Sequence, residues 1–119
     1  AEFTQSRPMI LRFSDILLVY AEAQGPTAEG YAAVNRIRTR AGLPDLPSGL
    51  SISEFRTAVV QERAWELAFE GKRFYDLRRT NSIESAFANA GQSNLLVVSE
   101  NLYTYPIPDL EIILNPNIN

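Results

Sequence analysis

Residues 61–78 read Gln-Glu-Arg-Ala-Trp-Glu-Leu-Ala-Phe-Glu-Gly-Lys-Arg-Phe-Tyr-Asp-Leu-Arg, and this stretch decides the fold. It continues a helix whose start is marked by Ser51 and Glu54, which occupy the two positions of a capping box. We expect this helix to run to about Glu70 and to stop at the glycine that follows. A shorter helix over residues 73–80 should come next, so this part of the chain predicts a helical pair.

Two further helices are expected on the N-terminal side. Residues 14–24 are apolar almost all round, with Ser14 as the N-cap and a Gly-Pro pair at the end. Thr27 then caps a second helix, and the glycine after residue 41 is typical of a left-handed cap. Because only three residues separate the two helices, they should fold back as an antiparallel hairpin.

The C-terminal side is less regular. Residues 83–90 predict one more short helix, whereas residues 95–98 and 103–105 are β-branched or aromatic segments that fit either a small strand pair or extended chain. Two nearby prolines exclude a central strand, and residues 108–114 can form one or two helical turns. The predicted fold class is therefore mostly α, with tetratricopeptide-like helical hairpins and a small extended C-terminal segment. No linker divides the chain, so residues 1–119 should be a single domain or a fragment.

Composition removes several classes of function. The 119 residues include no cysteine and no histidine, so a thiol nucleophile, a disulfide framework, a zinc site and a histidine base are all excluded. We expect no metal and no cofactor. The net charge of -3 disfavours a nucleic-acid partner. No apolar run approaches the ~20 residues that a membrane-spanning helix requires.

Three carboxylates of the helix after residue 51 stand among apolar residues. At 100° per residue, Glu62, Glu66 and Glu70 fall on one stripe, which also carries Phe55 and Phe69. Buried carboxylates require cations, and arginine, which supplies all but one of the 11 basic residues, can bond two carboxylate oxygens at once. We therefore expect a partly buried structural ion network whose members are Glu22, Arg38, Glu62, Glu66, Glu70, Arg73 and Asp76, with Asp76 closing onto Arg73 or Arg79.

Two interpretations of these carboxylates compete. Glu62 and Glu66 could be an acid/base pair of a hydrolase, or they could be ion-paired locks between helices. Arginine partners lower a carboxyl pKa, which makes a poor general acid at neutral pH. Two acids on one helical stripe also face the same way rather than across a substrate bond. The structural interpretation is favoured, and no catalytic residue is assigned.

Four aromatic residues, Trp65, Tyr75, Tyr103 and Tyr105, could form a stacking platform for sugar rings. Aromatic side chains at helical spacing more often fill a core, so core filling is the favoured interpretation for the set. Tyr103 and Tyr105 lie beside a proline and should be the most exposed of the four. They are the candidate ligand-stacking residues.

Four motifs follow one another along the chain, at residues 12–23, 33–43, 61–78 and 105–116. In that order they resemble the C-terminal region of the SusD/RagB family of outer-membrane nutrient-binding proteins. The resemblance implies that this chain comes from a surface lipoprotein. Such proteins capture glycans or other nutrients and pass them to a SusC-like TonB-dependent transporter. Family members are binding proteins rather than enzymes.

The resemblance also implies what this chain would contribute. It would be the C-terminal scaffold part of such a receptor, located at the cell surface and held to the membrane only through a lipid anchor that lies outside this chain. Its matched residues, among them Glu62, Glu66 and Arg73, would define the fold. The alternative interpretation is a stand-alone tetratricopeptide-like module for protein interaction.

Overall fold

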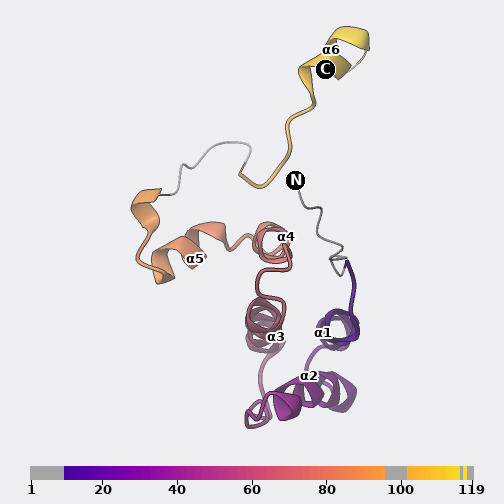
Figure 1. Ribbon diagram of the computed structural model, residues 1–119, viewed down its shortest axis with the longest axis vertical. Coiled ribbons are helices and arrows are strands. Elements are labelled where there is room, and N and C mark those ends of the chain that lie inside the picture. Colours follow the sequence, from indigo (N-terminus) through magenta and orange to yellow (C-terminus); the bar gives the residue numbers. More distant parts are fainter. Residues whose placement is uncertain (1–9, 96–101, 116, 118–119) are drawn as a thin grey trace, which may run out of the picture. The chain divides into compact units, whose positions relative to one another are not determined.

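The computed structural model describes residues 10–95, 102–115 and 117, and all regular elements in these ranges are helical (Figure 1). The mostly α fold class is therefore confirmed. The chain divides into two compact units, residues 1–73 and 74–119, which we describe one at a time. That residues 1–119 form a single domain or a fragment stays a prediction. No helix in the described part is both long and apolar enough to cross a membrane.

Unit 1 is built on three helices, α1 (Phe13–Gln24), α2 (Ala28–Arg40) and α3 (Ile52–Glu66). α1 packs against both α2 and α3, as the lower part of Figure 1 shows. The short connection between α1 and α2 makes them a helical hairpin. A single apolar core lies among the three helices and contains Leu18, Ala21, Ala33, Val34, Ile37, Phe55 and Val59.

Local sequence signals set most of the helix ends of unit 1. Thr27 accepts a hydrogen bond from the Gly30 backbone N–H, which confirms it as the N-cap of α2. At α3 both bonds of the capping box form between Ser51 and Glu54. The predicted cap at Ser14 is wrong, because α1 begins one residue earlier and its N-cap residue makes no side-chain capping bond.

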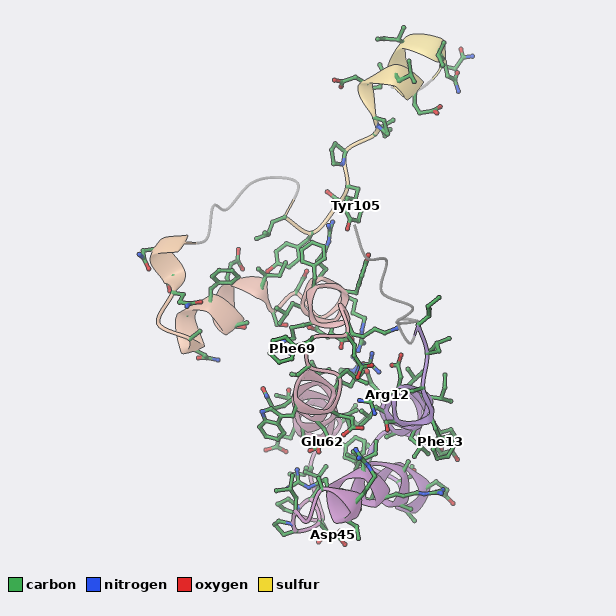
Figure 2. All side chains as sticks on the ribbon, viewed as in Figure 1. Arg12, Phe13, Asp45, Glu62, Phe69 and Tyr105 are labelled. Atoms are coloured by element: carbon green, nitrogen blue, oxygen red, sulfur yellow. The ribbon has the colours of Figure 1, made fainter. Side chains whose placement is uncertain are left out.

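The end of α3 also differs from the sequence prediction. The helix ends at Glu66 rather than near Glu70, because the chain then turns through two residues with positive φ, Phe69 at 65° and Gly71 at 73°. A left-handed residue cannot continue a right-handed helix. Phe69 is consequently fully exposed, on the side of α3 away from α1 (Figure 2), and does not extend the apolar stripe.

Unit 2 contains shorter elements: α4 (Arg73–Arg79, beginning at the last residue of unit 1), α5 (Ile83–Asn89), a 3-10 turn (Ser93–Leu95) and α6 (Asp109–Leu114). The three predicted C-terminal helices are confirmed to within one residue. Residues 103–105 contain no strand. Most of the other predicted extended segment, residues 95–98, lies outside the described residues.

Candidate functional site

Two groups of side chains stand out, and the larger one joins the helices of unit 1 through ion pairs. Arg12, just before α1, is its most connected member. Its Nη1 lies 2.5 Å from Glu66 Oε1, its Nε lies 2.8 Å from Glu70 Oε1, and it also donates to the Glu66 backbone carbonyl. Arg40 of α2 reaches Glu66 Oε2 at 2.5 Å. Figure 2 shows Arg12 between α1 and α3, so one guanidinium ties the start of the first helix to the end of the third.

A second ion pair connects α2 to α3. Arg38 Nη1 lies 2.6 Å from Glu62 Oε2, and only 4% of the Glu62 side chain is exposed. The Arg38 Nε also donates to the Pro44 backbone carbonyl at 2.7 Å. The same guanidinium therefore fixes both the partner helix and the loop that leads to it. We use the name interhelix ion pairs for three sets of contacts. These are the contacts of Arg12 and Arg40 with Glu66 and Glu70, the contact of Arg38 with Glu62, and the contacts of Asp15 and Glu22, which are described next.

The most buried of the interhelix ion pairs involves Asp15 of α1. Its Oδ1 accepts from Arg63 Nη1 at 2.8 Å, its Oδ2 lies 3.2 Å from Lys72 Nζ, and both Asp15 and Arg63 are buried. Burial alone would raise the pKa of Asp15, but hydrogen bonds from Arg63 and Lys72 and their positive charges outweigh it. The pKa of this carboxyl group therefore lies below its ordinary value.

The remaining predicted network members are placed as follows. Glu22 faces Arg56 of α3, with an Oε1 to Nε distance of 3.7 Å. In unit 2, Asp76 accepts from Arg79 Nη2 at 2.8 Å within α4. Arg73 does not join these pairs: its Nη1 is buried and finds no hydrogen-bond partner among the described residues. The structural ion network as a lock on the fold stays a prediction.

Several of the ion-pair partners were not predicted from the sequence. Asp15 is one of only two charges on an apolar helix, and that signal was available. Arg12 lies before the predicted start of any helix, so a helical wheel gave no reason to place it beside Glu66 and Glu70.

The charges around Glu66 decide what it can do chemically. Burial would raise its pKa, yet hydrogen bonds from Arg12 and Ser14 and the charges of Arg12 and Arg40 lower it below the ordinary value. An ionised, doubly paired carboxylate holds helices together but has no proton to donate at neutral pH. In the described part of the chain, no three acidic residues gather closely enough to hold a metal ion.

The second group of side chains lies in unit 2. Tyr75, Arg78, Arg79, Tyr103 and Tyr105 line a surface pocket of about 360 Å³, which we call the tyrosine-arginine pocket. The guanidinium carbon of Arg78 lies 3.9 Å from the centre of the Tyr105 ring (Figure 2 labels Tyr105). The Tyr103 hydroxyl donates to Glu84 at 3.1 Å, which fixes one wall of the pocket.

The exposure of the aromatic residues corrects two expectations and leaves a third open. Trp65 and Tyr75, favoured as core residues, expose 61% and 63% of their surface. Tyr105 is the most exposed of the four at 69%, as expected, but Tyr103 is half-buried and less exposed than Trp65 or Tyr75, so the expectation of high exposure is wrong for Tyr103. Their assignment as ligand-stacking residues stays a prediction. The proximity of Arg78 to these two tyrosines was not predicted, because about 25 residues separate them from Arg78 along the chain.

Unit 1 is thus a set of helices joined by ion pairs, and unit 2 carries a surface pocket lined by tyrosine and arginine side chains. The family model described as the SusD family matches residues 2–119, so the chain belongs to the SusD family, which consists of non-catalytic binding proteins.

Similar proteins agree with this assignment. The SusD-like protein P2 of Formosa agariphila is 33% identical, with 91% of this chain and 24% of the relative covered. The SusD-like protein P25 of the same organism is 31% identical, with 91% and 22% covered. A crystal structure of a SusD homolog from Bacteroides thetaiotaomicron matches with a TM-score of 0.68 and 37% identity, covering 92% of this chain and 25% of that one. This chain thus spans about a quarter of the length of the proteins it matches.

Proposed function

We propose that this chain is the C-terminal scaffold part of a non-catalytic nutrient-binding component of an outer-membrane uptake system. The nutrient is a glycan, and the partner is a SusC-like TonB-dependent transporter. The protein is located at the cell surface through a lipid anchor that lies outside this chain. The observation that carries the proposal is the SusD family match over residues 2–119.

The interhelix ion pairs support the scaffold role. They connect all three helices of unit 1, and each of their carboxylates lies within ion-pair distance of a cationic side chain. A buried charge that loses its partner destabilises a fold strongly, so such pairs favour one packing arrangement of the helices over others. On this proposal, Glu62, Glu66 and Asp15 are positioning residues for the scaffold and have no part in chemistry.

The test of the proposed function is binding without turnover. The protein that carries this chain is purified from its own outer membrane, its co-purifying proteins are identified, and it is applied to a glycan array. We expect a TonB-dependent transporter among those proteins and binding of at least one glycan that is recovered intact. Glycan cleavage that disappears in a Glu62→Gln or Glu66→Gln variant would contradict the proposal, as would the absence of both binding and transporter.

One observation favours the alternative of a stand-alone protein interaction module. The outer face of α1 is apolar yet exposed, with Phe13, Ile16, Val19 and Tyr20 all at least 44% exposed. Such a face is typical of a surface that another polypeptide covers. The two functions differ in what covers it: the rest of the same receptor or a separate protein. The length of the reading frame that encodes this chain decides between them.

A further inference from the structure

The arginine of the tyrosine-arginine pocket is held in place by aromatic rings. The guanidinium carbon of Arg78 lies 3.9 Å from the Tyr105 ring centre and 5.2 Å from that of Phe74. Stacking on a ring face holds the plane of the guanidinium group and leaves its N–H groups at the edge. Among the described residues, no carboxylate lies within ion-pair distance of Arg78.

Its neighbour in sequence shows the contrast. Arg79 donates from Nε and Nη2 to Asp76 Oδ1, at 3.0 and 2.8 Å. One arginine of the pocket is therefore neutralised by a buried carboxylate, whereas Arg78 keeps its charge at the pocket wall. A planar fork of N–H donors binds a carboxylate or a sulfate with two parallel hydrogen bonds.

The rest of the pocket wall is aromatic. Tyr75 and Tyr105 are mostly exposed, and together with Tyr103 they offer ring faces for the apolar side of a sugar and hydroxyls for its polar edge. A volume of about 360 Å³ lies near the lower end of the range for small-molecule sites, ~300 to 1,000 Å³. The pocket therefore suits one or two sugar rings rather than a long chain.

We propose that the tyrosine-arginine pocket binds an acidic sugar, with its carboxylate or sulfate on Arg78 and its ring against Tyr105 and Tyr75. This inference rests on the proposed function and names the class of glycan. Arg78 supplies the charge recognition, and the tyrosines supply the contact area. Tyr103 lines the pocket, and its hydroxyl donates to Glu84.

Isothermal titration calorimetry of the full chain tests the ligand class with three probes. These are digalacturonic acid, its fully methyl-esterified form, which is neutral, and a sulfated galactose disaccharide. We expect the acid to bind about tenfold more tightly than its ester, because one charge-assisted pair is lost on esterification. This advantage should shrink as salt is added. Comparison of the acid with the sulfated probe identifies which anion the pocket prefers. Equal affinity for the acid and the ester would overturn the proposal.

Variants then assign the preference to the pocket. Arg78→Gln should remove the preference for the acid over its ester. Tyr105→Ala should lower the affinity for both probes, whereas Tyr105→Phe should bind both with the affinity of the parent chain. Arg36 provides the matched control, because it stacks on Phe13 at 5.0 Å in unit 1 without lining the pocket. Arg36→Gln should leave both affinities unchanged. An Arg78→Gln chain that keeps the preference would overturn the proposal.

Two further readouts keep the test decisive. Circular dichroism verifies that each variant is folded. If Arg78→Gln is not folded, NMR of the parent chain should place the chemical-shift changes caused by digalacturonic acid at Tyr75, Arg78 and Tyr105. Shifts elsewhere would overturn the proposal. If only neutral glycans bind, the acidic-sugar inference fails and the proposed function stands. If the array finds no glycan at all, the proposed function fails too.

Discussion

Arginine is used differently in the two units. In unit 1, Arg38 and Arg63 are largely buried, and each is bonded to a carboxylate of another helix. In unit 2, Arg78 contacts aromatic rings at the wall of a pocket and has no carboxylate partner in the described part of the chain. The comparison teaches that pairing partner, rather than residue type, separates an arginine that holds a fold from one that is available to a ligand.

The largest expected effect comes from breaking an interhelix ion pair. Glu62→Ala leaves Arg38 without its partner at a site where little water can replace it, so we expect a loss of about 3 to 5 kcal/mol in the free energy of unfolding. Urea denaturation measures it. Glu29→Ala is the control, because this exposed glutamate of the same charge lies on α2 outside the interhelix ion pairs. The double variant Glu62→Met with Arg38→Met should recover much of the loss, and a single variant as stable as the parent would contradict the assigned role.

A smaller effect should follow acidification. The pKa values of Asp15 and Glu66 are lowered in the folded protein, so the unfolded chain binds protons first as the pH falls. The contribution of these two groups to the free energy of unfolding is fully present above their pKa in the unfolded chain, near pH 4. It is lost as the pH falls through their lower pKa values in the folded protein. Urea denaturation at a series of pH values measures the slope. Asp15→Asn should flatten it, whereas Arg78→Gln in unit 2 should not. An unchanged slope in Asp15→Asn would show that the pairing does not set the acid response.

The smallest effect compares the same residue type at helix starts in the two units. The Ser51 hydroxyl accepts from the Glu54 backbone N–H, whereas Ser82 precedes α5 without a side-chain capping bond. Ser51→Ala should cost about 1 kcal/mol in the free energy of unfolding. Ser82→Ala should cost about half as much, since the Ser82 hydroxyl satisfies no helical N–H group and contacts only the Thr80 hydroxyl and, at 3.5 Å, the Leu77 carbonyl among the described residues. Thermal unfolding monitored by circular dichroism measures both, and equal losses would contradict the difference in capping.

The sequence predicted local structure well where the signal was itself local. Thr27, Ser51 and Glu54 satisfy backbone N–H groups within one helical turn, so their roles follow from spacing alone. Ser14 does not cap α1, because its hydroxyl accepts a hydrogen bond from Arg12. The same arginine is ion-paired with Glu66 of α3. The early end of α3 depends on the left-handed conformation of Phe69, a residue type that gives no sign of it.

Predictions about the candidate sites were limited by distance along the chain. Helical periodicity found the carboxylates Glu62 and Glu66, because it depends only on neighbours within one helix. It could not find Arg12, which lies more than 50 residues away from Glu66. In the same way, Tyr105 attracted notice beside a proline, but its contact with Arg78 depends on how the chain returns to α4.

The pairing of Lys72 has a practical consequence, because it is the only lysine of the chain. Its Nζ donates to the Ile10 backbone carbonyl at 2.9 Å and lies 3.2 Å from Asp15 Oδ2, so both contacts hold the amine against the start of α1. An amine-reactive label should modify this side chain slowly in the folded protein and rapidly whenever the contact between the start of α1 and the end of unit 1 opens. Mass spectrometry of the peptide that contains Lys72, followed over time, would therefore measure the rate of local opening.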